Sequence, residues 1–253
     1  MPPISATIIT HNEAANIGRT IRSLDCADEI LVVDSGSTDE TLKIASELGA
    51  RTVVHAWEGF AAQKNFAVRQ AQNDWILSLD ADEEFNEDAR AAIREWKHST
   101  PAAAAYRFAR RARYLGRWIL HSGWYPDWKI RLFDRKQAQW QGDYVHESVV
   151  TSGKVEPLGG EILHYTCDSV ADHRKRIEFY TDLAAREMFE RGGRAGLGRL
   201  LLAPVWVFII TYFFRLGVLD GVAGFLIAWM AARYVHRKYI KLRALERSSK
   251  GKP

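Results

Sequence analysis

The sequence predicts an α/β fold in which helices flank a mostly parallel sheet, followed by an apolar helical hairpin. Three observations support this prediction. Residues 1–80 alternate short β-branched apolar runs with stretches of helical periodicity. A middle region rich in aromatic and basic residues follows, and from Leu200 to Ala232 the chain is almost entirely apolar. We therefore expect three parts, at residues 1–100, 101–195 and 196–253.

The first part contains strand and helix signals in regular alternation. We expect four strands, at residues 5–10, 29–34, 51–56 and 75–79. Helices are expected between them, at residues 13–24, from the Ser37–Glu40 capping-box spacing to Leu48, and at residues 59–72. Strands joined by helices of this length form βαβ units with parallel strands. The turns after the strands then fall on one edge of the sheet, where open α/β sheets bind ligands.

The middle region, residues 102–167, has short strand-like runs and no clear helical period. We expect an irregular α+β extension that covers the site. Its arginines suit phosphate and carboxylate groups of a ligand, and its tryptophans suit flat ring faces. The residues in question are Arg110, Arg111, Arg113, Arg117, Arg131 and Arg135, with Trp118, Trp124 and Trp128.

Composition narrows the class of protein. The chain has 253 residues, and its 47% hydrophobic and 26% charged content excludes wholesale disorder. Two cysteines, Cys26 and Cys167, cannot form a disulfide framework, and no zinc-ligand spacing is present. The start of the chain lacks the pattern of a signal peptide, so we expect the active residues to face the cytoplasm.

The apolar tail is expected to contact a membrane. Leu200–Phe214 and Leu216–Ala232 each fall short of the roughly 20 apolar residues of a comfortable span, with a turn at Asp220-Gly221. We expect two helices that lie in the interface or dip into it as a re-entrant hairpin. A two-pass hairpin, a buried helical hairpin and an oligomer contact are the alternatives. The basic segment 233–252 fits an anionic membrane surface better than a nucleic acid.

The segment Asp80-Ala81-Asp82-Glu83-Glu84 is the strongest chemical signal. Carboxylates this close repel one another unless a cation lies among them. Hard oxygen ligands after a buried strand suit Mg²⁺ or Mn²⁺, which usually arrive with a phosphate-bearing substrate. The pattern therefore predicts an enzyme that acts on the diphosphate of a nucleotide-sugar.

Three segments together resemble family 2 of the inverting glycosyltransferases with the GT-A fold. They are Thr-Ile-Ile-Thr-His-Asn-Glu at 7–13, Ile-Leu-Val-Val-Asp-Ser-Gly-Ser-Thr-Asp at 30–39 and Leu-Asp-Ala-Asp-Glu at 79–83. The match runs from Ile4 to about Phe85. The rest resembles a bacterial subgroup that includes lipopolysaccharide inner-core β-glucosyltransferases. Its signals are residues 124–127 (Trp-Tyr-Pro-Asp), 131–133 (Arg-Leu-Phe), 145–147 (Val-His-Glu) and 217–221 (Gly-Val-Leu-Asp-Gly).

The resemblance implies roles for the residues at the strand ends. Asp34 would hydrogen-bond the uracil of the donor, and Thr10 and Glu13 would belong to the first nucleotide-contacting loop. Asp80 would face the ribose or a metal-bound water, and Asp82 would ligate the metal at the diphosphate. A divalent ion there can offset the charge that develops on departing UDP.

Inversion also needs a base for the proton of the acceptor hydroxyl. Glu147 stands where family members place an acidic catalytic residue, and we predict that it is the base. Many members have Glu-Asp at this point and this chain has His146-Glu147, so Asp127 stays open as an alternative. By the same resemblance His146 would orient the carboxylate or touch the diphosphate, and Lys64 would reach a donor phosphate. The arginines of the middle region would then face the charged groups of the acceptor, and its tryptophans would stack on sugar faces.

We therefore expect a metal-dependent inverting glycosyltransferase at the cytoplasmic face of the bacterial inner membrane. It would move a hexose, glucose in the first instance, from a UDP-sugar to a membrane-anchored glycolipid such as a lipopolysaccharide core intermediate. One alternative acceptor is a polyprenyl phosphate, which is already ionised and needs no base. The other alternative is a non-catalytic, membrane-anchored module that binds nucleotide-sugars.

Overall fold

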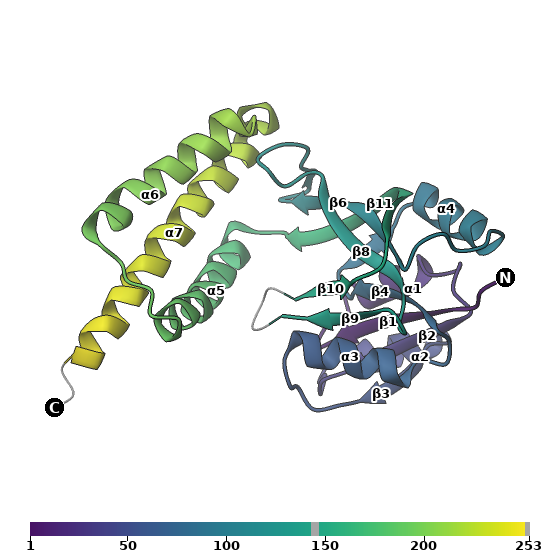
Figure 1. Ribbon diagram of the computed structural model, residues 1–253. Helices are drawn as coiled ribbons and strands as arrows, with labels where there is room; N and C mark the ends of the chain where they lie inside the picture. Colours follow the sequence, from purple (N-terminus) through teal and green to yellow (C-terminus); the bar gives the residue numbers. More distant parts are fainter. Residues whose placement is uncertain (143–146, 251–253) are drawn as a thin grey trace. The chain divides into compact units, whose positions relative to one another are not determined.

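The computed structural model describes residues 1–142 and 147–250 and divides into two units, each built from two stretches of chain (Figure 1). Unit 1 comprises Met1–Arg111 and Asp127–Tyr165. Unit 2 comprises Ala112–Pro126 and Thr166–Pro253. The segment 112–126, which lies between two strands of the sheet, therefore belongs with the C-terminal helices.

The N-terminal half of unit 1 is the predicted parallel sheet. Its strands are β1 (Ile4–Thr10), β2 (Glu29–Asp34), β3 (Arg51–Val54) and β4 (Trp75–Asp80), in the order β3-β2-β1-β4. The helices between them are α1 (Ile17–Arg22), α2 (Thr41–Glu47) and α3 (Phe60–Gln70). Every pair in this half is parallel, and the register places Thr10 opposite Asp34 and Ile9 opposite Asp80. The predicted α/β class is confirmed.

The strands that extend the sheet beyond β4 include antiparallel pairs. These strands are β5 (Glu83–Phe85), β6 (Ala105–Tyr114), β7 (Arg117–Trp118), β8 (Asp127–Asp134) and β11 (Val155–Cys167). They extend the sheet from β4 in the order β8-β6-β11-β5, with β7 paired to β6. A separate hairpin of β9 (Ala138–Gln141) and β10 (Ser148–Thr151) follows β8, and α4 (Glu87–Lys97) precedes β6.

The expectation of an irregular α+β middle region is wrong. The described residues between α4 and α5 contain no helix, and β6 and β11 run for 10 and 13 residues. The physical reason lies in β6, where Tyr106-Arg107-Phe108 alternates apolar and basic side chains with the period of two that a two-faced strand requires. Tyr106 and Phe108 are buried and Arg107 is exposed.

Helices and the β9–β10 hairpin cover both faces of the sheet. On one face, Ile4 and Ile8 of β1 share a core with residues of α1, α2 and α4. On the other face, Leu31 and Val33 of β2 pack against Ala67 of α3. Further along that face, a third cluster joins the sheet to the β9–β10 hairpin. This packing fixes the edge at which β1, β2 and β4 end.

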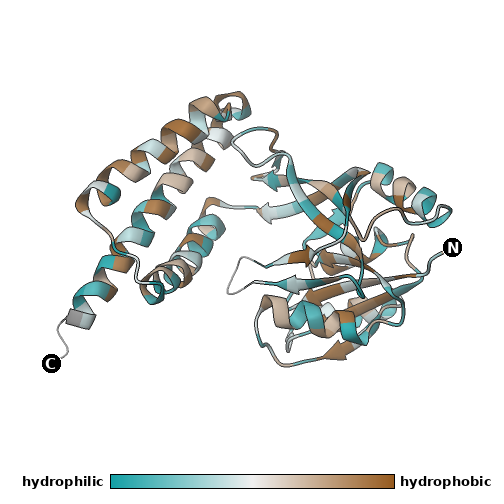
Figure 2. Ribbon diagram, viewed as in Figure 1, coloured by the Kyte–Doolittle hydropathy of each residue, from teal (hydrophilic) through white to brown (hydrophobic). Residues whose placement is uncertain are grey.

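Unit 2 contains the predicted helical hairpin. Its elements are α5 (Val170–Glu190), α6 (Leu197–Ile209) with a π-helical turn at Ile210–Phe214, a 3₁₀ turn at Gly217–Asp220, and α7 (Gly221–Lys250). Leu197–Phe214 and Gly217–Ser249 are long and apolar enough to cross a membrane by length and composition. Figure 2 shows the hydrophobic residues concentrated along α6 and the first half of α7.

The start of α2 differs from the prediction. Ser37 does not cap the helix: its hydroxyl donates to Asp34 and accepts from the backbone N–H of Asn12. Helix α2 begins at Thr41, whose N–H donates to Asp39 at 3.0 Å. The capping-box spacing was misleading because the nearby strand end competes for the same hydroxyl.

Candidate active site

The ends of β1, β2 and β4 lie side by side at one edge of the sheet. Thr10 is in register with Asp34, and Ile9 is in register with Asp80. Asp82 follows two residues after the end of β4. The expectation that these turns share an edge is confirmed, because parallel strands in register end together.

Asp34 is held by its own turn. It is fully buried, and its Oδ2 accepts hydrogen bonds from the N–H groups of Gly36 (2.8 Å) and Ser37 (2.7 Å). Gly36 has φ of 92°, a conformation that favours glycine. With the Ser37 hydroxyl on Oδ1, three of the roughly four acceptor positions of the carboxylate are used. One position is left for an external N–H donor, and the contact with uracil stays a prediction.

The loop after β1 is tied to the loop after β2. The backbone N–H of Asn12 donates to Ser37 Oγ at 2.8 Å, and the Asn12 side chain accepts from the N–H of Thr38 at 2.8 Å. Glu13 binds Asn16 through its side chain at 2.7 Å. Thr10 is buried, and its hydroxyl has no hydrogen-bond partner within the described ranges. A buried hydroxyl without a partner at a strand end is a position for a polar ligand atom.

Lys64 contacts two other predicted site residues, Asp80 and Glu147. Its Nζ lies 2.7 Å from Oδ1 of Asp80 and 3.0 Å from Oε1 of Glu147. Lys64 comes from α3 and is only 3% exposed. The structure therefore joins the expected phosphate-binding lysine, the first aspartate of the Asp-x-Asp motif and the expected base.

The same contacts continue from Asp80 to Asp127. Arg131 Nη2 lies 2.8 Å from Oδ2 of Asp80 and 2.7 Å from Oε2 of Glu83. Arg110 then links Glu83, at 2.8 Å, to Asp127, at 2.6 Å. We call this sequence of alternating charges the ion-pair chain; its members are Glu147, Lys64, Asp80, Arg131, Glu83, Arg110 and Asp127.

The cations of the ion-pair chain keep its buried acids ionised. Burial alone would raise the pKa of Asp80, but the charges of Arg131 and Lys64 hold it well below its usual range. Glu83 is fully buried, and Arg131 and Arg110 likewise outweigh burial and lower its pKa. The ion-pair chain contains four acidic and three basic side chains, so it has one net negative charge when all seven are ionised.

Trp140 of β9 lies over the cations. Lys64 Nζ is 4.3 Å from the centre of its indole ring, and the Arg131 guanidinium is 5.8 Å away. Asn65 of α3 donates to the carbonyl of Trp140 at 2.8 Å and accepts from its N–H at 3.1 Å. The indole N–H of Trp140 and Nε of Arg131 are buried without a hydrogen-bond partner in the part of the chain that the structure describes.

Asp82 is the acid of the motif that lies outside the ion-pair chain. Its Oδ2 is 3.3 Å from Nε2 of His164 on β11. Within residues 1–142 and 147–250, no group of three or more His, Cys, Asp or Glu side chains forms a metal site. The donor set still fits Mg²⁺ or Mn²⁺, because these ions commonly take one or two carboxylates and complete their coordination with substrate phosphates. Asp82 is the better placed ligand, since both oxygens of Asp80 already contact cations.

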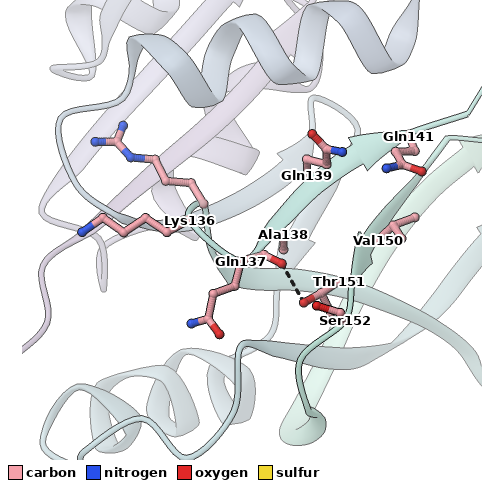
Figure 3. Close-up of a pocket in the computed structure, with 9 residues that line it drawn as sticks. Lys136, Gln137, Ala138, Gln139, Gln141, Val150, Thr151 and Ser152 are labelled. Atoms are coloured by element: carbon pink, nitrogen blue, oxygen red, sulfur yellow. Dashed lines mark hydrogen bonds between the residues drawn. The ribbon is translucent and has the colours of Figure 1, made fainter.

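An open recess of about 330 Å³ lies on the side of β9 opposite to the Trp140 side chain (Figure 3). Gln139 and Gln141 line it, whereas Trp140 between them is buried against Phe133 and Lys64. The carbonyl of Gln137 accepts a hydrogen bond from Thr151 at 2.8 Å across the recess wall. No residue of the ion-pair chain lines this recess, so it is separate from the acids.

The two predicted bases occupy opposite ends of the ion-pair chain. Asp127 has both oxygens engaged, Oδ2 by Arg110 and Oδ1 by Lys129 at 3.1 Å. Glu147 contacts Lys64 through Oε1. His146, predicted to assist Glu147, lies outside the described residues.

The expectation that Arg131 faces an acceptor is wrong, because it is buried between Asp80 and Glu83. Sequence reasoning also left Glu83 without a firm role and missed Trp140 and His164. The available signal for Arg131 was its place in a strand, where the burial of alternate residues is set by pairing with distant partners.

Comparisons with known proteins identify the family to which the chain belongs. Residues 5–153 match the family model described as glycosyl transferase family 2. The chain is 33% identical to an uncharacterized glycosyltransferase of Rickettsia typhi, over 99% of this chain and 90% of that protein. It is 31% identical to the lipopolysaccharide core biosynthesis glycosyltransferase LpsC of Rhizobium meliloti, over 92% of this chain and 88% of that protein. The solved structure of S. aureus TarS 1–349 with UDP-GlcNAc aligns with 97% of this chain and 92% of that chain at a TM-score of 0.47 and 15% identity.

Proposed function

The chain belongs to glycosyl transferase family 2, and from that premise we propose that it transfers a hexose with inversion from a UDP-sugar to a membrane-anchored glycolipid. We propose glucose as the hexose and a lipopolysaccharide core intermediate as the acceptor. The ion-pair chain is the observation that supports this most strongly. It gathers a lysine, the first aspartate of the Asp-x-Asp motif and a downstream carboxylate beside the strand ends where α/β sheets bind ligands.

Donor binding would use the strand ends and Lys64. The remaining acceptor position of Asp34 suits the imide N–H of uracil, and the hydroxyl of Thr10 is available to the nucleoside. Lys64 would turn from the carboxylates to a donor phosphate. Asp82, with Asp80 beside it, would hold a divalent cation that offsets charge on the departing diphosphate when bound.

Transfer would then need one base. The oxygen of the acceptor hydroxyl attacks the anomeric carbon, the bond from that carbon to UDP breaks with its electron pair going to the diphosphate, and the proton goes to a carboxylate. Glu147 suits this role better than Asp127, since both oxygens of Asp127 are held by Arg110 and Lys129. Lys64 Nζ lies 3.0 Å from Glu147, so movement of Lys64 to the phosphate would free the Glu147 carboxylate for the acceptor hydroxyl.

The acceptor and location are proposed on two grounds. The name of the Rhizobium meliloti relative refers to lipopolysaccharide core biosynthesis. The two apolar segments of unit 2 fit an enzyme that works at the cytoplasmic face of the inner membrane on a lipid-linked saccharide. Transfer to a polyprenyl phosphate is the second candidate, and a non-catalytic nucleotide-sugar-binding module is the third.

Donor profiling tests the proposal. The purified full-length chain is incubated with Mg²⁺ or Mn²⁺ and a panel of nucleotide-sugars, and UDP release is measured with and without extracted truncated lipopolysaccharide. We expect release from UDP-glucose to rise when the lipopolysaccharide is added. Release that rises only with polyprenyl phosphate would favour the second candidate, and binding of UDP without release under either metal would favour the third.

A further inference from the structure

Helix α6 and the first part of α7 expose large apolar side chains. The exposed set runs from Leu197 to Trp229 and includes Leu202, Phe214 and Val222, which are 70%, 73% and 75% exposed. No residue of α6 itself is buried. An exposed apolar surface of this extent on a soluble chain marks a contact with lipid or with another protein.

Helix α7 has two different faces. Ala223 and Ile227 are buried in a cluster with Tyr114, Ile119 and Cys167 of the same unit. Val222, Phe225 and Trp229 recur at helical spacing on the exposed face. The exposed stripe therefore faces away from the protein contacts of α7, as expected for a helix that covers protein on one side and meets another phase on the other.

The turn of the hairpin is bound to the segment 112–126. Asp220 is buried and accepts from the N–H of His121 at 3.1 Å, from the hydroxyl of Ser122 at 3.1 Å, and pairs with His121 Nδ1 at 3.0 Å. The N–H of Ser122 donates to the carbonyl of Arg215 at 2.8 Å. We call these contacts the clasp. A Cβ on Gly217 would lie 2.9 Å from Ser122 Oγ, so the two segments approach closely.

The open end of the hairpin is bound to polar parts of unit 2. Arg237 contacts Glu178 of α5 at 2.7 Å, and Lys241 contacts Asp182 at 2.9 Å. Glu246 near the end of α7 accepts from the N–H of Ala195, just before α6, at 2.8 Å. Two of the tail cations expected to bind anionic lipid are thus paired within the protein.

Chain length limits where the turn can lie. The chain advances by five residues from Ser122 to Asp127, which begins β8, and five residues reach at most about 18 Å when fully extended. The hydrocarbon core of a bilayer is about 30 Å thick. A sheet with unpaired edges and charged strands cannot enter it. With the clasp closed, the turn therefore cannot lie across a bilayer from the sheet.

We infer that the hairpin is monotopic: it lies along the surface of an anionic bilayer, with the exposed stripe from Leu197 to Trp229 inserted into one leaflet and both its turn and its open end on the same side as unit 1. Charge complementarity supports lipid as the occupant, because the exposed Arg194 and Arg199 border the apolar stripe where α6 begins. The inference deepens the proposed function by assigning the mode of attachment, and it excludes a two-pass hairpin.

Cysteine accessibility tests the sidedness. The native Cys26 and Cys167 are buried, which keeps the background low. Single Leu219→Cys (turn) and Ser248→Cys (open end) variants of the full chain are labelled with a membrane-impermeant maleimide in inside-out and right-side-out vesicles of the inner membrane. We expect neither site to react in right-side-out vesicles, Ser248→Cys to react in inside-out vesicles, and Leu219→Cys, which belongs to the inserted stripe, to react in inside-out vesicles once detergent is added. Reaction of Leu219→Cys in right-side-out vesicles would overturn the inference.

Vesicle binding tests the surface itself. Purified protein is sedimented with phosphatidylethanolamine–phosphatidylglycerol vesicles, and Leu202→Asp and Trp206→Asp are compared with the control Val54→Asp, which changes an equally exposed side chain on β3. We expect each hairpin variant to bind about tenfold more weakly, and the control to bind like the wild type. Equal binding of all four proteins, or a lipid-free dimer that shields Trp206 and fails to bind vesicles, would overturn the inference.

UDP binding by the same proteins in detergent separates this inference from the proposed function. Retained vesicle binding with no UDP binding would refute the proposed function alone. Normal UDP binding with sidedness reversed at Leu219 would refute the monotopic attachment alone.

Discussion

Arg131 is the residue on which the ion-pair chain depends most. It is the shared partner of Asp80 and Glu83; Arg131 and Glu83 are buried, and Asp80 is partly buried. Buried ion pairs contribute modest net stability, but removing one partner leaves a buried charge without compensation. The consequence is that Arg131 is expected to matter for folding before it matters for catalysis.

Arg131→Met should destabilise the protein by about 3–5 kcal/mol at pH 7. The deficit relative to wild type should shrink toward pH 4, because Asp80 and Glu83 can then be protonated when their cation is missing. Urea unfolding at both pH values measures this. Arg94→Met is the matched control: Arg94 pairs with Asp25 at the surface, at 2.7 Å, and should cost no more than about 1 kcal/mol. An equal loss in the two variants would contradict the argument.

Glu147→Gln should lower kcat by about 10²- to 10⁴-fold while leaving the affinity for UDP nearly unchanged, because it removes the proposed base and keeps the side-chain volume. Steady-state kinetics together with calorimetric titration of UDP measure the two effects. Asp127→Asn serves as the comparison and should cost far less turnover. Near-normal turnover of Glu147→Gln would instead indicate an acceptor that is already ionised, such as a polyprenyl phosphate.

The residues at the site could be predicted only in part. Asp34, Asp80 and Asp82 stand in short local motifs at the ends of apolar runs, and such positions can be recognised from the chain alone. Arg131, Trp140 and His164 are brought to the site by strand pairings with partners far away in sequence. Their register depends on the whole sheet, which a local pattern does not encode.

At the scale of elements, the turn between α6 and α7 leaves no room for a side chain at Gly224 of α7. A Cβ on Gly224 would lie 1.8 Å from the carbonyl oxygen of Gly217. Gly224→Ala should therefore displace the turn and lower the free energy of unfolding by about 1–3 kcal/mol or more. Gly198→Ala, on exposed α6 with nothing near its Cβ, should be neutral or stabilising by up to about 1 kcal/mol. Chemical denaturation in detergent compares them, and equal effects would argue against the close approach.

The elements that were predicted well are those whose signals are local. The strand at Glu29–Asp34 coincides with the expected one, since a buried parallel strand is a continuous apolar run between turns. Helix α1 is shorter than expected because Glu13–Asn16 form a turn that is bonded to the neighbouring loop. The long strands of the middle region were missed because their alternation mixes arginine with aromatic residues, and Arg110 is partly buried by its pairing with Glu83 on another strand.

At the scale of the whole molecule, acid should weaken the fold before it changes the secondary structure. Hydrogen bonds and cations hold the pKa of the exposed Asp28 below its usual range, and they do the same for Glu29, Asp80 and Glu83, where they outweigh burial. A carboxyl with a depressed folded-state pKa contributes stability that is present above about pH 4 and lost as the pH falls through its folded value. Urea midpoints should therefore drop steeply below about pH 4. A flat profile there would contradict the ionised state of these acids.

High pH should also lower the free energy of unfolding. Burial raises the pKa of the Cys26 thiol to about 11, from 9.0. The unfolded chain releases this proton first, so the contribution of Cys26 is lost as the pH rises from about 9 towards 11. In Cys26→Ala, the free energy of unfolding should fall less over this pH range than in the wild type. An equal fall in both proteins would mean that other groups cause it.

The discontinuous make-up of unit 2 has a consequence for biosynthesis and for any attempt to shorten the chain. His121 leaves the ribosome about 5–20 s ahead of Asp220, the residue that completes its hydrogen bonds, at ordinary elongation rates. During that interval Tyr114 and Ile119 lack the apolar partners that α7 supplies. Truncation before α6 would leave these apolar side chains without partners permanently. A catalytic fragment made in this way should therefore aggregate. Replacing residues 112–126 by a short polar loop should prevent the aggregation.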